Sequence, residues 1–257
     1  MRVTLYPPSE LLAPYLQSFT VVESHEPQTR TLVPDACIVV GFRYAGAAAL
    51  VRGDTRQELP NATFTGLRDQ ARCMCTAADS GVLLARFRAG AAAAFFQRPL
   101  HTTFGSALAL EALAPAPEVR RTIEAVTGAA DDAARIAVLE RFLLERLRSV
   151  AHDALVSSAL RAIEREPVST RVGVLARQLG ISCDRLEKRF RRVVGASPKR
   201  FARILRLRRS VDLYPSASNL TELAIAAGYC DQSHFIREFR AFTGEPPSRF
   251  FGSVPYC

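Results

Sequence analysis

The C-terminal part of the chain contains one pattern written twice, and this doubling constrains the fold more than any other feature. The first copy reads Leu175-Ala176-x2-Leu179-Gly180, then Leu186-x3-Phe190-Arg191-x3-Gly195-x-Ser197-Pro198-x2-Phe201. The second reads Leu223-Ala224-x2-Ala227-Gly228, then Phe235-x3-Phe239-Arg240-x3-Gly244-x-Pro246-Pro247-x2-Phe250. The offset is 48 residues up to the Gly and 49 after it. Each copy has the order helix, glycine-containing turn, helix that is typical of a helix-turn-helix.

Two such units at a fixed spacing can place two recognition helices in successive major grooves. The pattern predicts a supporting helix over residues 172–179. We expect Ser182 to cap the first recognition helix and Asp231 to cap the second. Ser197 followed by Pro198 predicts the start of a long helix through Leu213. That helix would join the two units and hold their separation rigid.

The doubled pattern resembles the DNA-binding domain of the AraC/XylS family of bacterial transcription regulators. The second copy carries the resemblance best, in the run from Gly228 to Arg240 followed by Phe242-Thr243-Gly244, and the match covers residues 168–250. Residues 32–40 and 82–96 resemble, more loosely, the sensor domains of some family members, although Ala36 stands where the family has Gly. The resemblance implies a DNA-binding regulator with an N-terminal sensor or association domain.

Charge is concentrated in the same part of the chain. The net charge is +9, and residues 153–257 hold 18 Lys and Arg against 10 Asp and Glu, or +8. Residues 1–152 hold 16 against 15, or +1. Positive charge confined to the doubled pattern is the electrostatic footprint expected for a phosphate backbone.

The apolar positions Leu186, Phe190, Phe235 and Phe239 should face the core, which leaves the opposite face of each recognition helix for DNA. The predicted base-reading residues are Asp184, Arg185, Glu187, Lys188, Gln232, Ser233, His234 and Arg237. Arg and Lys donate to guanine, Gln pairs with adenine, and carboxylates accept from cytosine. The predicted phosphate contacts are Ser182, Arg189, Arg191, Arg192, Lys199, Arg200 and Arg240. For most of these cations, a solvated surface position is the alternative.

The N-terminal part is predicted to be β-rich to about residue 88 and helical beyond it. Short apolar runs at 19–22, 31–33, 37–42, 48–51 and 82–87 are separated by turn residues, which favours a small β-barrel or sandwich. Helices are expected to start near residues 10–12 and to span 91–97, 115–126 and 131–152. The last is interpreted as a dimerisation helix or as a helix packed on the barrel. The fold class is therefore α+β overall, with domains at 1–152 and 153–257.

Three N-terminal residues are predicted to bind an effector, namely Arg86, Arg88 and Cys37. Strand alternation places the two arginines on one face, where they could anchor an acidic ligand in an apolar pocket or simply face solvent. Cys37, Cys73 and Cys75 could form a thiol or soft-metal site. Ordinary packing of small buried side chains is the alternative for all three.

No other motif indicates chemistry. The sequence has no Gly-rich phosphate loop, nucleophile elbow or zinc-type Cys spacing, so we expect no enzyme activity, no cofactor and no metal. It has no apolar run of 18 residues and no signal pattern, so a cytoplasmic protein without a membrane partner is expected. The expected partner is double-stranded DNA, and RNA polymerase, a small-molecule effector and a second copy of the chain are further candidates. The alternative function is a DNA-binding protein with a Cys-dependent enzymatic or thiol- or metal-sensing N-terminal domain.

Overall fold

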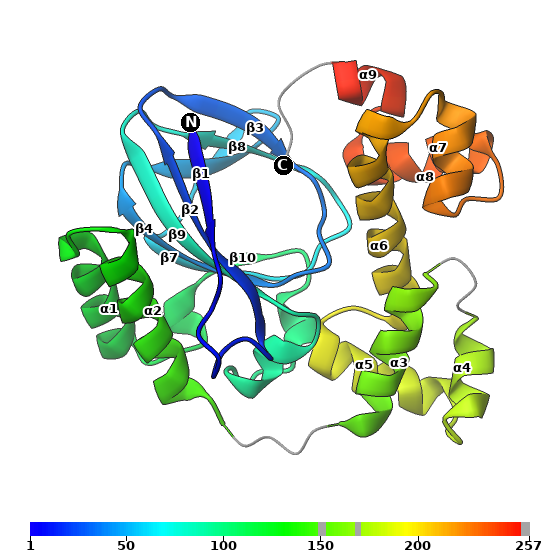
Figure 1. Cartoon of the computed structure of the whole chain (residues 1–257), viewed down its shortest axis with the longest axis horizontal. Helices are drawn as coiled ribbons and strands as arrows, with labels where there is room; N and C mark the ends of the chain where they lie inside the picture. Colours follow the sequence, from blue (N-terminus) through cyan, green and yellow to red (C-terminus); the bar gives the residue numbers. More distant parts are fainter. Residues whose placement is uncertain (149–152, 168–170, 253–257) are drawn as a thin grey trace.

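The computed structural model describes residues 1–148, 153–167 and 171–252. Its N-terminal part contains two antiparallel sheets (Figure 1). The first has the order β1 (Arg2–Tyr6), β2 (Leu16–Ser24), β9 (Ser80–Phe87), β4 (Val39–Ala45), β7 (Ala62–Thr65) and β10 (Ala107–Ala109). The second has the order β3 (Gln28–Leu32), β8 (Arg72–Thr76), β5 (Ala48–Arg52) and β6 (Thr55–Glu58). The predicted β-rich part is confirmed, but the barrel is not closed, because each sheet ends in edge strands such as the fully exposed β6.

Strand alternation builds the N-terminal core. In β9 every second residue from Gly81 to Phe87 is buried, as expected for a strand with one face on the core. Six fully or almost fully buried phenylalanines fill this core, namely Phe19, Phe42, Phe64, Phe87, Phe95 and Phe96. Helices α1 (Ala116–Gly128) and α2 (Asp132–Arg146) pack on the sheet (Figure 1).

Several local expectations in this part need correction. Residues 10–12 form a turn, and the strand before them, β1, was not expected because its side chains are mostly exposed. The short helix at residue 91 is a 3-10 turn, η1 (Ala91–Ala94). Helix α2 ends at Arg146 because Leu147 is extended, and residues 149–152 of the predicted helix lie outside the described residues. The buried side chains of α2 include Phe142, whose ring centroid lies 5.6 Å from that of Phe42, so this stripe packs on the sheet.

The C-terminal part is helical, as predicted. It contains α3 (Ala154–Arg165), α4 (Val172–Gln178), α5 (Cys183–Val194), α6 (Pro198–Leu213), α7 (Leu220–Ala227), α8 (Gln232–Thr243) and α9 (Pro247–Gly252). Ser182, Ser197 and Asp231 cap α5, α6 and α8 through their side chains, which confirms all three predicted caps. Helix α6 joins α3, α4 and α5 at one end to α7 and α8 at the other (Figure 1). Residue 168, where the family resemblance begins, lies outside the described residues.

The repeated glycines have a shared physical cause. Gly195 and Gly244 follow α5 and α8 with φ of +99° and +84°, and Gly180 and Gly228 end the supporting helices with φ of +67° and +91°. This left-handed region favours glycine, which has no Cβ to clash with the following carbonyl oxygen. Glycine therefore recurs at equivalent positions of the two copies because each copy has the same left-handed turns.

The two parts of the chain are in contact. The backbone N–H of Ala71 donates to the carbonyl oxygen of Phe242 at 2.7 Å. Val33 is buried in the same apolar cluster as Leu223 and Phe239 of the C-terminal part. On the other unit, the 3-10 turn η2 (Leu100–Thr103) packs on α5. The N-terminal part thus contacts both repeated units.

Candidate nucleic-acid interface

Helix α5 presents a polar face to solvent. Leu186 and Phe190 are fully buried, as predicted, and the Phe190 ring packs edge-on against Phe201 of α6. Asp184, Arg185, Glu187 and Lys188 are all exposed. Lys188 lies 3.0 Å from Asp184, one turn earlier, and both side chains are about three quarters exposed. Such an exposed pair is weak, so Lys188 can exchange this partner for a base at little cost.

Helix α8 repeats this arrangement. Phe235 and Phe239 are fully buried, whereas Ser233 and Arg237 are exposed, and Gln232 and His234 are partly exposed. The Thr221 hydroxyl of α7 donates to Oε1 of Gln232 at 2.8 Å. His234 Nε2 lies 3.7 Å from the carboxylate of Glu238 on the same helix. Among the described residues Arg237 forms no ion pair, and its guanidinium is available for a ligand.

The residues predicted to contact phosphate are in different environments. The Ser182 hydroxyl oxygen accepts the Arg185 N–H at 3.2 Å, and Arg192 and Arg240 are exposed near the ends of α5 and α8. Arg189 differs from the others, because its Nε donates to Asp153 at 2.8 Å. The remaining three, Arg191, Lys199 and Arg200, line a cavity.

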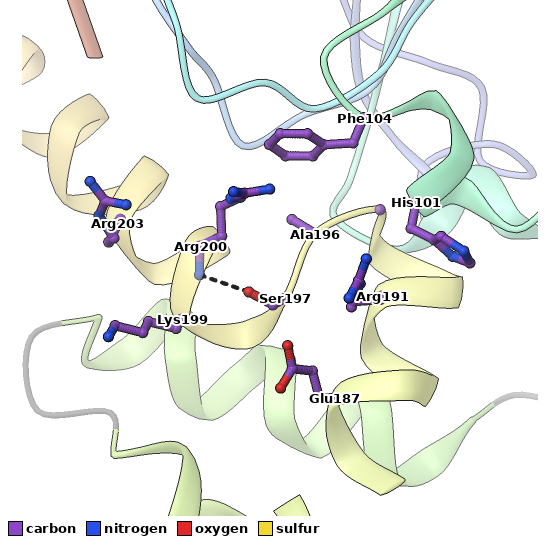
Figure 2. A pocket seen from close by; sticks show the side chains of 10 residues that line it. His101, Phe104, Glu187, Arg191, Ala196, Ser197, Lys199, Arg200 and Arg203 are labelled. Atoms are coloured by element: carbon purple, nitrogen blue, oxygen red, sulfur yellow. Dashed lines mark hydrogen bonds between the residues drawn. The ribbon is translucent and has the colours of Figure 1, made fainter. Parts of the chain in front are cut away.

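That cavity has a volume of about 660 Å³ and lies where η2 meets α5 and the start of α6 (Figure 2). Figure 2 shows Phe104 of the N-terminal part over Arg200, and His101 on the side of the cavity where Arg191 lies. Arg200 Nε lies 3.1 Å from Asp69, and its guanidinium lies over the Phe104 ring at 4.7 Å. Arg203, also in the lining, bonds Glu238 at 3.2 Å. Glu187 is the one acidic side chain among the lining residues that the structure describes.

The predicted effector residues lie elsewhere. Arg86 bonds Asp35, and Asp35 is also held by the Ala36 N–H at 2.7 Å. Burial alone would raise the pKa of Asp35, but the charges of Arg86 and Arg208 and the hydrogen bonds from Arg86 and the Ala36 N–H together outweigh it and lower that pKa. Arg88 Nε donates to the carbonyl oxygen of Ala13 at 3.0 Å, away from Asp35. Arg86 and Arg88 therefore bind different groups, a carboxylate for Arg86 and a backbone carbonyl for Arg88.

The thiols do not form the predicted cluster. Burial raises the pKa of Cys37 to about 12, and its Sγ lies 3.4 Å from Asp35. Cys73 and Cys75 interact with each other on β8, and burial and that neighbour raise the pKa of Cys73. Within the described ranges no three His, Cys, Asp or Glu side chains are placed to hold a metal ion. A neutral buried thiol is a poor nucleophile and a poor metal ligand, so packing explains Cys37 best.

Sequence reasoning did not single out three acids that organise this surface, namely Asp69, Asp153 and Glu238. Each pairs with an arginine far away in sequence or on another helix. Only Asp153 had a recognisable sequence pattern, since an Asp directly before a helix is a typical N-cap. Its Oδ1 does accept the Val156 N–H at 3.1 Å.

No helix in the part of the chain that the structure describes could span a lipid bilayer.

Comparisons with known proteins agree with this geometry. Residues 175–253 match the model of a family described as a helix-turn-helix domain, and residues 4–108 match a domain of unknown function. No curated protein sequence matches the chain.

Solved structures with a similar fold include ToxT from Vibrio cholerae, at 10% identity over 98% of both chains with a TM-score of 0.52. ToxT with a bound unsaturated fatty acid matches at 12% identity over 92% of this chain and 95% of that chain, with a TM-score of 0.45. An AraC-type regulator from Chromobacterium violaceum matches at 22% identity over 39% of this chain and 85% of that chain, with a TM-score of 0.32. Residues 175–253 therefore carry a helix-turn-helix domain, and nearly the whole chain shares the fold of ToxT.

Proposed function

We propose that the protein reads a two-part DNA site with α5 and α8. One observation carries this proposal: two recognition helices at equivalent repeat positions bury their phenylalanines and expose polar faces. On α5 the readers are Asp184, Arg185, Glu187 and Lys188, and on α8 they are Gln232, Ser233, His234 and Arg237. Exposed Arg, Lys and Gln near the start of a recognition helix suit the major-groove edges of guanine and adenine.

The affinity would come from phosphate contacts around these helices. Ser182, Arg191, Arg192, Lys199 and Arg240 remain proposed contacts, and Arg200 joins them only when it leaves Asp69. Residues 153–257 would form the DNA-binding domain and residues 1–152 the control domain. Such a regulator would work in the cytoplasm by binding rather than catalysis, and contact with RNA polymerase would follow from its position at a promoter.

Selection of bound sequences from a random DNA library tests this function. We expect a site with two specified segments about ten base pairs apart, since one helical turn separates adjacent major grooves on one face. Inserting five base pairs between the segments should abolish tight binding, whereas an insertion in flanking DNA should not. Enrichment of one short segment alone would contradict two-helix reading.

We further propose that the N-terminal part responds to a small carboxylate held in the cavity of Figure 2. Arg200 and Arg203 are neutralised by Asp69 and Glu238, which leaves Arg191 and Lys199 for an anion. Phe104 supplies an apolar wall. Because η2 and α5 both line the cavity, a ligand there would favour the arrangement in which the two parts touch, and so change DNA affinity.

Calorimetric titration of the full chain with octanoate tests the cavity. Arg191→Gln combined with Lys199→Gln should weaken binding about tenfold, the effect of roughly 1.4 kcal/mol. Arg52→Gln combined with Arg56→Gln removes the same charge from exposed positions on β5 and β6 and should leave binding unchanged. Equal binding by all three proteins would remove the cavity as the effector site. Arg86, Arg88 and Cys37 would then be the next residues to test.

We propose separately that two copies of the chain form a homodimer. Sedimentation velocity of the full chain tests this. The apolar stripe of α2 is used in packing on the sheet, so it does not supply the interface. A thiol- or metal-sensing function is not favoured by any observed contact.

A further inference from the structure

The repeat is longer than the two-helix pattern visible in the sequence. Six residues lie between the end of α3 and the start of α4, and six lie between the end of α6 and the start of α7, so α3 and α6 correspond at the offset of 48. At this offset Val156, Ala159 and Ile163 align with Ile204, Leu207 and Val211. All six side chains are buried. Each unit is therefore three helices, α3–α5 and α6–α8.

In this extended alignment each unit has an ion pair of its own at an equivalent position. Arg189 on α5 aligns with Glu238 on α8 at the offset of 49. Arg189 Nε bonds Asp153, the cap residue of α3, at 2.8 Å. Glu238 bonds Arg203 Nε at 3.2 Å and Arg206 Nη2 at 3.0 Å, both on α6. In each unit, the residue at this position of the recognition helix therefore forms an ion pair with the first helix of the same unit. The recognition helix supplies the cation in the first unit and the anion in the second.

The acidic partners of these pairs are largely shielded from solvent. The Glu238 side chain is 8% exposed and Arg206 is 15% exposed, while Asp153 is 18% and Arg189 37% exposed. Breaking a partly buried pair leaves one charge poorly solvated, which costs far more than losing a surface pair. The pairs also lie beside the proposed readers, since Arg189 follows Lys188 and Glu238 lies 3.7 Å from His234.

We infer that Arg189 and Glu238 are positioning residues, each of which sets the angle of its recognition helix against the preceding helix. This assignment removes Arg189 from the phosphate contacts. It rests on the proposed reading of DNA by α5 and α8. A recognition helix held at a fixed angle keeps its side chains in register with the base edges, because small misplacements break bidentate hydrogen bonds.

Binding of the full-length variants to single-base variants of the selected site, at two salt concentrations, tests this inference. Arg189→Gln should reduce discrimination about tenfold in the segment read by α5 and leave the other segment unchanged. Its salt slope should equal that of the wild type, because no phosphate contact is lost. Glu238→Gln should reduce discrimination in the α8 segment alone. Arg189→Lys should retain most of the wild-type discrimination in that segment, since it keeps the positive charge beside Asp153.

Two controls separate positioning from other roles. Arg192→Gln removes one charge from an exposed position of the same helix. It should weaken all sequences about equally and lower the salt slope by about one. Asp153→Asn keeps an oxygen for the α3 cap, and combined with Arg189→Gln it should cost no more discrimination than Arg189→Gln alone.

The outcomes are distinct. If Arg189→Gln lowers the salt slope and spares discrimination, Arg189 is a phosphate contact and the inference fails. If either variant damages both segments equally, its role is general stability and the inference fails. If the wild type discriminates in neither segment, the proposed DNA reading fails first, before any variant is compared.

Discussion

The side chains of the two recognition helices fall into three groups: those buried in the core, those held in ion pairs with the preceding helix, and those available for a ligand. Phe190 and Phe239 are buried, Arg189 and Glu238 are tethered to the helix before them, and Arg237 is available. Sequence spacing predicted the first group, because buried phenylalanines recur at helical intervals. It could not predict the second, because the partners Asp153 and Arg206 lie on other helices. Whether the available residues read bases remains a prediction.

Arg237→Ala should weaken binding to the selected site by about 1–3 kcal/mol and relax preference at one or two base pairs. The reason is the loss of an exposed guanidinium on the groove-facing side of α8. Binding of the variant to single-base operator variants measures this, with Arg56→Ala on the exposed strand β6 as the control. Equal weakening on every sequence would make Arg237 a backbone contact.

Asp35 should contribute to the acid sensitivity of the fold. Burial would raise its pKa, but the charges of Arg86 and Arg208 and the hydrogen bonds to the carboxylate together outweigh that effect, so the pKa in the folded state lies below the ordinary value. The stabilisation is present above the unfolded-state pKa of about 4 and is lost as pH falls through the folded-state pKa. Urea unfolding of Asp35→Asn between neutral and acid pH should show a smaller loss of stability on acidification than the wild type. A parallel decline in both proteins would contradict this role.

Helix ends determine how the elements connect. Ser182, Ser197 and Asp231 cap their helices, and Gly195 ends α5 in the left-handed region. These signals are local, since each cap acts within a few residues, and the sequence therefore predicted them correctly. The order of the strands in the two sheets and the early end of α2 were not predicted, because strand pairing and the packing of Leu147 depend on residues distant in sequence.

Gly195→Ala should destabilise the protein by about 1–2 kcal/mol, the cost of a left-handed residue with a Cβ. The new Cβ would lie 3.4 Å from the carbonyl oxygen of Leu100, an ordinary van der Waals contact, so the cost comes from the backbone conformation. Gly128→Ala is a matched control at the end of α1, where a Cβ meets open space. Thermal unfolding of both variants measures the difference, and equal melting temperatures would show that the turn is not strained.

Contacts between the two parts organise the whole molecule. Asp69 and Phe104 of the N-terminal part hold Arg200, a proposed phosphate contact, and Ala71 bonds Phe242 near the end of α8. If Arg200 contacts DNA as proposed, DNA and the N-terminal part would compete for it. The charge asymmetry of the sequence indicated which part binds DNA, but it could not indicate that the other part holds one of the cations.

The fragment 153–257 should bind DNA with a steep salt dependence, because its phosphate contacts release counterions. In the full chain, Asp69→Asn should increase the salt slope by about one, since Arg200 becomes available to a phosphate. Glu58→Gln changes an exposed carboxylate on β6 by the same charge and serves as the control. An unchanged slope in Asp69→Asn would show that Arg200 does not contact DNA.

The sequence by itself determined the doubled helical unit, its caps, its left-handed glycines and the basic charge of the C-terminal part. These features depend on side-chain periodicity and backbone conformation within a few residues, so they can be read along the chain. Only the tertiary structure decided which acid each arginine meets, that α3 completes the first unit, and that a cavity lies between η2 and α5. Those features join residues that are distant in sequence, and their energies depend on burial and on distances between charges.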